Sequence, residues 1–226
     1  MSGTERKSLY FIPWIIFYTY SVYLLVSLGY YDSFLFLNNK LNFPALNDFF
    51  VYITLLGDWA IAAGILIVRK RNNPGLLKEL LFIAIVGIFI QLLKTLFFNN
   101  YDRPPGVFEE NKFIYLEIIK MKNHSFPSGH SAVAAAWTLL VARKSRIVPV
   151  IIGLAVLGIL IAFSRVYIGV HFLGDIVAGS LITFVLYFLL FGFLSKLKIP
   201  GKFNRLYYLG FVIIGIRLFV YFVFRV

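Results

Sequence analysis

Seven long runs of apolar residues set what this chain can fold into. A bilayer core about 30 Å thick takes roughly 20 helical residues to cross, and most of the runs approach that length. The runs are Leu9–Leu28, Phe49–Val68, Leu80–Phe98, Ser128–Ala142, Ile147–Ser164, Asp175–Leu194 and Leu206–Phe224. Only 14% of the 226 residues are charged, whereas soluble domains carry about 25%. The sequence therefore predicts an all-α polytopic membrane helix bundle, a single domain over 1–226 with six core transmembrane helices and a seventh C-terminal helix.

The basic residues alternate between connections, and this alternation predicts how the chain is oriented. Four connections hold 13 of the 22 Lys and Arg residues. They are Arg6, Lys7, Arg69, Lys70, Arg71, Lys78, Arg143, Lys144, Arg146, Lys196, Lys198, Lys202 and Arg205. Because cytoplasmic loops are enriched in Lys and Arg, we expect these connections and the N-terminus in the cytoplasm, and the loops 29–48, 99–127 and 165–174 on the outer face. The net charge of +12 suits anionic lipid headgroups, and no nucleic-acid partner is expected.

The outer face gathers the residues that could carry chemistry. All three histidines and three cations lie there: His124, His130, His171, Lys94, Arg103 and Arg165. Ionisable groups within a membrane are costly and usually functional. At a helical rise of ~1.5 Å per residue, Lys94 and the turn 127–130 should lie at similar depth, slightly below the outer surface. This one-sided collection of cations and imidazoles predicts an anion site, with phosphate as the expected ligand.

The sequence Pro127-Ser128-Gly129-His130 begins the fourth apolar run. A helix start leaves backbone N–H groups free to bind an oxyanion, and a glycine lets the oxyanion approach them closely. A Pro-Ser-Gly sequence by itself is more often a simple helix cap. His130 favours the binding site, because it adds an acid or base beside those amides.

The segment from Ser164 to Asp175 carries a stronger signal. His171 and Asp175 are four residues apart, which would put them on one face of a helix. A carboxylate bonded to one imidazole nitrogen fixes the tautomer and raises the basicity of the other nitrogen, so the ring can act as a nucleophile or base. An ordinary His–Asp surface pair is commoner in general. Arg165 makes that alternative weaker here, because a guanidinium six residues upstream can bind phosphate oxygens in a fork.

Three sequence elements together resemble the signature of the type 2 phosphatidic acid phosphatase superfamily. They are Lys94 followed by Arg103-Pro104, then Pro127–His130, then Ser164-Arg165 followed by His171 and Asp175. The last two match the family pattern fully, and the resemblance covers residues 80–194. Two features depart from the family. Residues 95–102 make the spacing between Lys94 and Arg103 longer than usual, and the seventh run exceeds the usual number of spans.

The resemblance implies a metal-independent phosphatase with a phosphohistidine intermediate and no cofactor. His171 would attack phosphorus, positioned by Asp175, while His130 would protonate the leaving oxygen and then activate water. The phosphate-binding residues would be Lys94, Arg103, Ser128, Gly129 and Arg165, with Lys112, Lys120 and Lys122 as alternatives to Lys94. The chain has no cysteine and no carboxylate cluster beside the outer-face histidines, so no metal is expected. His124 has no place in the motifs and is expected to be a loop residue.

The depth of the site suits a lipid phosphate whose headgroup stays anchored by its chains. The resemblance implies a bacterial inner-membrane phosphatase acting at the outer face on lipid A 1-phosphate, undecaprenyl diphosphate or phosphatidylglycerol phosphate, with the first two favoured. A phosphotransferase that passes phosphate to a second lipid is a close alternative. A transporter or scramblase is another, but it would need polar groups through both leaflets, and only Asp58 and Arg217 lie near mid-membrane.

Asp58 and Arg217 carry opposite charges at matching depths, ~17 and ~18 Å from the cytoplasmic boundary at the helical rise. Each alone in hydrocarbon would be costly, so we predict that they pair and tie the seventh run to the second. The alternative is that Arg217 snorkels to the interface while Asp58 accepts bonds from nearby backbone or from Lys94.

The outer loop 99–127 is the longest connection. Its stretch Lys112–Lys120 mixes apolar residues with Glu117 and Lys120. Two interpretations stay open for this stretch, a short helix lying in the membrane interface and an ordinary loop.

Overall fold

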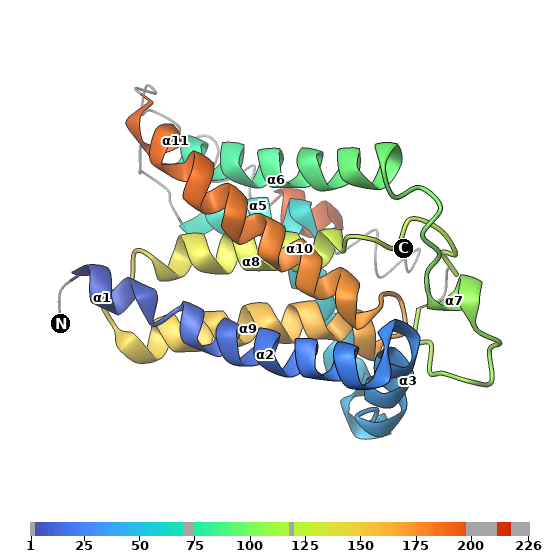
Figure 1. The fold of residues 1–226 in the computed structure, drawn as a ribbon. Helices are drawn as coiled ribbons and strands as arrows, with labels where there is room; N and C mark the ends of the chain where they lie inside the picture. The colour runs from blue at the N-terminus through green and yellow to red at the C-terminus, as the bar shows by residue number, and fades with distance from the viewer. Residues whose placement is uncertain (1–2, 70–74, 118–119, 198–211, 218–226) are drawn as a thin grey trace.

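The fold is a bundle of helices, seen in a computed structural model that describes residues 3–69, 75–117, 120–197 and 212–217 (Figure 1). The helices are α1 (Gly3–Ser8), α2 (Phe11–Leu28), α3 (Tyr30–Lys40), α4 (Asn47–Ile53), α5 (Trp59–Arg69), α6 (Leu76–Leu96), α7 (Pro104–Val107), α8 (Gly129–Ala142), α9 (Val148–Tyr167), α10 (Leu173–Leu186) and α11 (Gly192–Lys196). Short 3-10 turns η1 (Pro44–Leu46) and η2 (Thr54–Gly57) flank α4, and the π-turn η3 (Tyr187–Phe191) joins α10 to α11. Residues 212–217 are also helical, and the described part of the chain contains no β-strand.

The bundle is that of a multi-pass membrane protein. Four helical segments within the described ranges are long and apolar enough to cross a bilayer: Glu5–Leu28, Leu76–Leu96, Val148–Tyr167 and Leu173–Lys196. The bent pair Pro44–Gly57 and Trp59–Arg69 would make a fifth, and α8 is a shorter apolar helix. The predicted count of six core spans stays a prediction. Of the seventh run, Leu206–Phe224, all but 212–217 lies outside the described residues.

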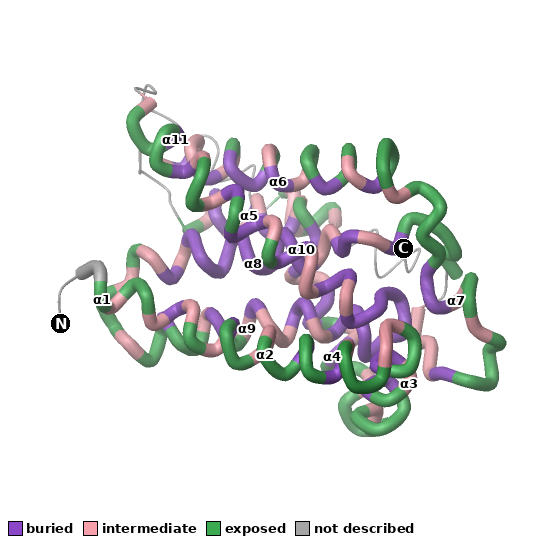
Figure 2. Tube along the Cα trace, in the orientation of Figure 1, coloured by how far each residue is buried: buried purple, intermediate pink, exposed green. Residues whose placement is uncertain are grey.

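Helix α8 lies at the centre of the bundle, in contact with α5, α6, α9 and α10. Figure 2 shows it buried along nearly its whole length. A helix that is apolar on all sides has to be covered on all sides. The small side chains of Ala132, Ala134, Ala135 and Ala136, all fully buried, let the neighbouring helices approach its backbone closely. The first turn of α8 is therefore held inside the molecule, where it can shape a buried site.

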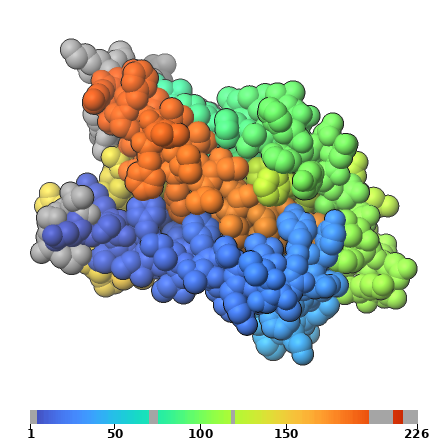
Figure 3. Space-filling view, in the orientation of Figure 1, coloured from blue at the N-terminus to red at the C-terminus, as the bar shows by residue number. Residues whose placement is uncertain are grey.

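The outer surface of the bundle is apolar, as a lipid-facing surface should be. Figure 3 shows α10, in orange, running obliquely between α2, in blue, and α6, in green. Helix α2 exposes Ile15, Ile16, Tyr23 and Val26 on its outward side. Exposed apolar surface of this extent marks contact with a membrane or a partner.

The second predicted span, Phe49–Val68, is wrong as one continuous helix, because the chain bends by 72° between Pro44–Gly57 and Trp59–Arg69. Asp58 is extended at the bend, and its Oδ1 accepts hydrogen bonds from the N–H groups of Ala60 (2.8 Å) and Ile61 (3.3 Å). An aspartate that bonds the first free amides of a helix starts a new helix at that point. The bend therefore follows from a helix N-cap inside an apolar run.

The predicted pairing of Asp58 with Arg217 is confirmed. The Nε atom of Arg217 lies 2.9 Å from Oδ2 of Asp58. The described part of the seventh run, 212–217, is thus fixed to the start of α5, and Ile213 packs on the main hydrophobic core. Asp58 also accepts the two backbone bonds that were part of the alternative.

The loop predicted over 29–48 contains a helix, α3, which the hydropathy pattern did not reveal. Its buried positions, Ser33, Phe34, Leu37 and Asn38, recur with helical spacing. The Asn38 amide donates to the carbonyls of Val166 (3.0 Å) and Tyr167 (2.9 Å) and accepts from the N–H of Ile114 (2.7 Å). Helix α3 is therefore a support for the end of α9 and for the loop 108–117.

The stretch Lys112–Lys120 is not an interfacial helix where the structure describes it. Residues 113–117 are irregular, and the N–H of Leu116 bonds to the carbonyl of Ile168 (3.1 Å). Phe113 is buried in the second hydrophobic cluster, against α3. The ordinary-loop interpretation therefore holds for these residues, while 118–119 lie outside the described part.

Candidate active site

Four helix ends meet at one end of the bundle. The C-termini of α6 and α9, the N-termini of α8 and α10, and the loop 97–127 converge at the end opposite α1 (Figure 1). This arrangement brings together residues that are far apart in the sequence. It also puts them at the end of the molecule away from α11 and the α8–α9 connection, which carry the basic residues predicted to be cytoplasmic.

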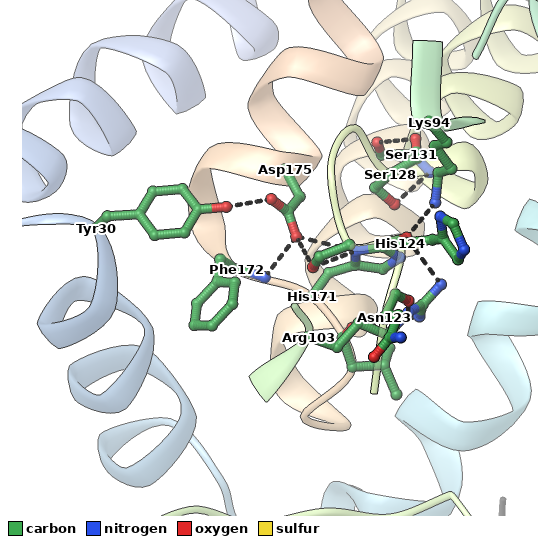
Figure 4. Close-up of polar contacts among 12 residues, drawn as sticks. Tyr30, Lys94, Arg103, Asn123, His124, Ser128, Ser131, His171, Phe172 and Asp175 are labelled. Carbon is green, nitrogen blue, oxygen red and sulfur yellow. Dashed lines mark hydrogen bonds and ion pairs between the residues drawn. The ribbon is translucent and has the colours of Figure 1, made fainter. Parts of the chain in front are cut away.

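His171 and Asp175 form a buried pair at this end. Nδ1 of His171 lies 3.0 Å from Oδ2 of Asp175, and the two side chains are 2% and 0% exposed (Figure 4). The prediction that they share a helical face is wrong, because α10 starts at Leu173, two residues after His171. The reason is local: Oδ2 of Asp175 also accepts the N–H of Phe172 (3.0 Å), which caps the helix at that residue.

Two further donors hold the Asp175 carboxylate. The hydroxyl of Ser125 donates to Oδ2 (2.5 Å), and the hydroxyl of Tyr30, on α3, donates to Oδ1 (Figure 4). Burial and the neighbouring carboxylate both raise the pKa of Tyr30, so its hydroxyl keeps the proton that it donates. With the His171 and Phe172 bonds, both carboxylate oxygens are occupied, so the carboxylate and the imidazole it touches have fixed orientations.

The turn between α9 and α10 explains the spacing from Arg165 to His171. The carbonyl oxygen of Arg165 accepts the N–H groups of Val170 (3.0 Å) and His171 (3.1 Å). Gly169 has a φ of +83°, and an added methyl group there would meet the carbonyl oxygen of Ile114. A left-handed residue without room for a side chain has to be glycine. The end of the Arg165 helix therefore sets the position of the imidazole.

The Arg165 side chain is buried beside this turn, with 5% of its surface exposed. Its Nη1 atom donates to Thr54 of η2 (2.8 Å) and to Glu117 (3.1 Å). Its Nε atom is buried and has no hydrogen-bond partner among the described residues. A buried guanidinium donor without a partner is costly, and an anion in the neighbouring cavity would supply one.

Lys94 and Arg103 converge on the loop that carries His124. Nζ of Lys94 donates to the carbonyl of His124 (2.9 Å), and Nη2 of Arg103 approaches the same oxygen (3.5 Å). Arg103 also donates to the carbonyls of Asn123 (3.0 Å) and Val170 (3.4 Å). The residues between the end of α6 and Arg103 accommodate the long sequence spacing between Lys94 and Arg103. The side chains of both cations therefore reach the cavity. The alternatives Lys112, Lys120 and Lys122 are exposed, and Lys120 pairs with Glu110.

The start of α8 contributes a glycine and a second imidazole. Gly129 and His130 line the cavity, whereas Ser128 is fully buried and acts as the N-cap, accepting the N–H of Ser131 (3.4 Å). The Ser128 N–H donates to the carbonyl of Asp175 (3.0 Å), and a methyl group on Gly179 would overlap the Ser128 carbonyl. The starts of α8 and α10 are therefore in direct contact.

The cavity has a polar end and an apolar wall. It has a volume of about 730 Å³. Its polar end is lined by Lys94, Arg103, Gly129, His130, Arg165 and His171. The apolar wall runs along α5 and α6 past Ala63, Ile67, Ile83, Ala84 and Leu80. The distance from Lys94 to Leu80 along α6 is ~21 Å at the helical rise, so the shape suits an anionic headgroup with a long apolar tail.

The charges at the polar end change how its groups bind protons. The pKa of His171 is well below its ordinary value of 6.5, first because burial disfavours the charged ring and then because Arg103, Lys94 and Arg165 repel it. Burial also lowers the pKa of Arg103 to about 10, so its guanidinium is still charged at neutral pH. The site therefore combines a neutral imidazole with a charged guanidinium.

We expect the imidazole of His171 to stay neutral well below pH 6.5. A lowered pKa means that acid must be stronger before the ring takes a second proton, so the midpoint moves down in pH. Because the chain has three histidines, the variant His124→Gln, His130→Gln leaves His171 as the reporter. Its titration can be followed by NMR of isotope-labelled histidine in detergent micelles. A midpoint at or above 6.5 would contradict the buried, cation-flanked arrangement.

Several contacts of the site could not be read from the sequence. Tyr30, Thr54 and Glu117 lie outside the motifs and are common residue types, so only the fold brings them to Asp175 and Arg165. Ser125, which donates to Asp175, also lies outside the motifs. It is only two residues before Pro127, so its position gave the clearest hint of a role in the site. His124 lies in a loop as predicted, but its carbonyl oxygen, at a residue with φ +58°, accepts bonds from both Lys94 and Arg103.

The fold and the site together define a multi-pass membrane protein with a cavity at one end of its helix bundle that is lined by cationic side chains and imidazoles. The model of the PAP2 superfamily matches residues 75–199, more than half of the chain, and all eight predicted site residues fall within it. The chain belongs to the PAP2 superfamily.

Comparison with known proteins gives relatives of three kinds. The chain is 34% identical over 95 residues to phosphatidylglycerophosphatase B of Bacillus subtilis, over 37% of this chain and only 46% of that protein. It is 24% identical over 189 residues to an undecaprenyl-diphosphatase of Sulfolobus acidocaldarius, over 78% of this chain and 87% of that protein. The crystal structure of Aquifex aeolicus LpxE has a TM-score of 0.57 and 27% identity, over 69% of this chain and 90% of that chain.

Proposed function

We propose that the protein is an integral-membrane lipid-phosphate phosphatase that works through a phosphohistidine intermediate. The observation that carries this proposal is the convergence of the His171–Asp175 pair, His130 and three buried cations on the polar end of an apolar cavity. Phosphoryl transfer needs mainly positioning and stabilisation of charge, and these residues supply both. The superfamily membership and the phosphatase names of the relatives support it.

In the first step, Nε2 of His171 attacks phosphorus. Nδ1 faces Asp175, so the opposite ring nitrogen is the one directed away from the carboxylate. Asp175 keeps the proton on Nδ1 and stabilises the positive charge that develops on the ring. Lys94, Arg103 and Arg165 bind the equatorial oxygens, with the amide of Gly129 as a further ligand. A phosphorus–nitrogen bond forms while the phosphorus–oxygen bond to the lipid breaks.

In the second step, the phosphoenzyme is hydrolysed. His130 gives its proton to the oxygen that leaves with the lipid, and it then takes a proton from a water molecule that attacks the phosphohistidine. The products are the dephosphorylated lipid, inorganic phosphate and free His171. The position of His130 on the cavity wall, at the start of α8, is what this role requires.

The substrate class is a phospholipid or prenyl lipid with a terminal phosphate. The apolar wall of the cavity fits a lipid chain, and the names of the relatives point to phosphatidylglycerol phosphate and undecaprenyl diphosphate. Lipid A 1-phosphate is the third candidate, from the sequence resemblance. Transfer of phosphate to a second lipid in place of water is the alternative reaction of the same site.

The proposed setting is a bacterial inner membrane, with the N-terminus in the cytoplasm and the site facing outward across six core spans. Helix α1 and the site lie at opposite ends of the bundle, as this topology requires (Figure 1). The reaction is proposed to need no metal. Among the described residues, no three His, Cys, Asp or Glu side chains form a group that could hold a metal ion.

The proposal is tested by phosphate release from purified protein in detergent, with phosphatidylglycerol phosphate, undecaprenyl diphosphate and lipid A 1-phosphate compared by their kcat/KM values. We expect turnover of at least one of them, unchanged by EDTA and inhibited by vanadate, which mimics pentavalent phosphorus. Loss of activity with EDTA that zinc or magnesium restores would overturn the metal-independent mechanism.

Two outcomes distinguish the alternatives. Radiolabelled phosphate that appears on a second lipid, and not as inorganic phosphate, would identify a phosphotransferase. Lipid flipping in reconstituted vesicles that His171→Ala leaves intact, without phosphate release by the unmodified protein, would identify a transporter.

A further inference from the structure

Glu117 is a carboxylate held against the cations of the site. Its Oε1 lies 3.1 Å from Nη1 of Arg165, and the two side chains are 31% and 6% exposed. Within the described part of the chain, Glu117 is the one carboxylate that pairs with any of the three cations, because Lys94 and Arg103 donate to backbone carbonyls there. The cations that would bind phosphate therefore already have one negative charge beside them.

The guanidinium of Arg165 is bonded along one side only. Its Nη1 atom carries both the Glu117 bond and the bond to Thr54 (2.8 Å). Its Nε atom is buried without a partner, and no described group bonds to Nη2. The Nε–Nη2 edge is one of the forks through which arginine binds a phosphate. A phosphate bound there would lie about 6 Å from the Glu117 carboxylate, the span of two hydrogen bonds.

The backbone that carries Glu117 is fixed to the rest of the site. The N–H of Leu116 donates to the carbonyl of Ile168 (3.1 Å), in the turn between Arg165 and His171. Two residues earlier, the N–H of Ile114 donates to the side chain of Asn38 (2.7 Å). Residue 117 therefore stays beside Arg165 when an anion binds, and its charge acts on that anion.

The charge of Glu117 also acts on Arg103. Burial lowers the pKa of Arg103 to about 10 and the charge of Arg165 lowers it further, whereas the charge of Glu117 raises it. An opposite charge favours the charged form of a group. Glu117 therefore acts on two of the three cations that would bind phosphate.

Three buried cations favour the substrate, but they also favour the product. Inorganic phosphate is left among them after the dephosphorylated lipid departs. A lipid substrate gains further affinity from the apolar wall of the cavity, and free phosphate does not. Binding that is equally strong in the ground state and the transition state does not raise kcat. A carboxylate beside the anion weakens phosphate binding and leaves the contribution of the lipid chain intact.

We propose that Glu117 sets the affinity of the site for phosphate, as a resident counter-ion that opposes retention of the inorganic phosphate product. The inference rests on the proposed function. Glu117 acts through its charge and through Arg165, and it takes no part in the bonds that form and break at phosphorus. In the empty site, the same carboxylate offsets the repulsion between the buried cations.

The test measures inhibition by inorganic phosphate, with phenol release from an aryl phosphate as the readout. Glu117→Gln keeps an acceptor for Nη1 and removes the charge, so the Ki for phosphate should fall about ten-fold, the effect of a unit charge about 6 Å from a dianion even at the dielectric constant of water. Glu117→Asp keeps the charge and should change Ki less than about three-fold. Glu110→Gln, on the same loop with its side chain 83% exposed, is the matched control and should leave Ki unchanged.

Thr54→Val provides the contrast, because it removes the neutral partner of the same nitrogen. Arg165 then loses a positioning bond but no charge changes, so the Ki for phosphate should rise. A Ki that rises in Glu117→Gln as it does in Thr54→Val, or that does not change, would overturn the inference, since Glu117 would then only orient Arg165.

Thermal unfolding in detergent gives a second measurement that needs no turnover. A fixed concentration of phosphate should raise the Tm of Glu117→Gln more than that of the unmodified protein, because stabilisation by a ligand grows with its affinity. If Glu117→Gln does not fold, Glu117→Ser removes the same charge and leaves Thr54 bonded to Nη1. Equal Tm shifts would overturn this inference alone. Absence of turnover of every phosphate ester by the unmodified protein would overturn the proposed function, while the Tm shifts would still decide the role of Glu117.

Discussion

Replacing His171 by alanine is expected to abolish phosphate release and the covalent phosphoenzyme, with a loss of about five to six orders of magnitude in kcat. The variant keeps Asp175 and the cations but has no ring nitrogen to attack phosphorus. Stopped reactions with labelled substrate, quenched in alkali because phosphohistidine is labile in acid, measure both quantities. Normal turnover by this variant would show that another group is the nucleophile.

His130→Ala provides the contrast. An aryl phosphate has a good leaving group that needs little protonation, so its phosphoenzyme should still form, while hydrolysis of the intermediate should slow. We therefore expect labelled enzyme to accumulate in His130→Ala and to be absent from His171→Ala. Both variants must elute as a single folded peak in detergent for the comparison to count.

Asp175→Asn is expected to lower kcat by about 10³- to 10⁴-fold, the scale seen when a carboxylate that fixes a histidine tautomer becomes an amide. The carboxylate accepts bonds from His171, Ser125, Tyr30 and the N–H of Phe172. In the variant, an amide NH₂ group replaces one carboxylate oxygen. It would then face hydrogen-bond donors that the oxygen accepts in the unmodified protein, so the imidazole would lose its orientation. Single-turnover kinetics measure the loss.

Tyr30→Phe is the matched variant, since it removes one donor to Oδ1 and leaves the bond between His171 and Oδ2. Its loss in kcat should be about ten-fold or less, as for one hydrogen bond. If Asp175→Asn loses no more than Tyr30→Phe, the carboxylate would be a structural support of α10 and not a partner of the imidazole.

The sequence predicted the parts of the fold and site that depend on local pattern. Apolar run lengths identified most of the spans, and the spacing of Pro127–His130 and of Arg165 to Asp175 identified two segments that meet at the cavity. Opposite charges at matching depth predicted the contact of Asp58 with Arg217, although 159 residues separate them. Each of these signals is carried by residue types that are costly anywhere else in a membrane.

The rest depended on tertiary structure. Hydropathy over a window of about 20 residues averages across a helix N-cap, so the 72° bend at Asp58 was invisible to it. Gly57-Asp58 is the local signal for the bend, but it lies within a continuous apolar run. Tyr30 could not be assigned because its role depends on α3 packing over the end of α9 through Asn38. The matched family segment, 75–199, does not include this support.

The contact between Ser128 and α10 has a consequence for building chimaeras of this protein. The N–H of Ser128 bonds to the Asp175 carbonyl, and Gly179 leaves the space that the Ser128 carbonyl fills. The two segments therefore form one packed contact, although 46 residues of chain (129–174) lie between Ser128 and Asp175. A chimaera with its crossover anywhere from 132 to 170 would take the two sides of this contact from different parent proteins, in which they did not evolve together. Exchanges that take 125–131 and 171–179 from the same parent keep it intact, and helix-surface segments facing lipid can then be exchanged freely around it.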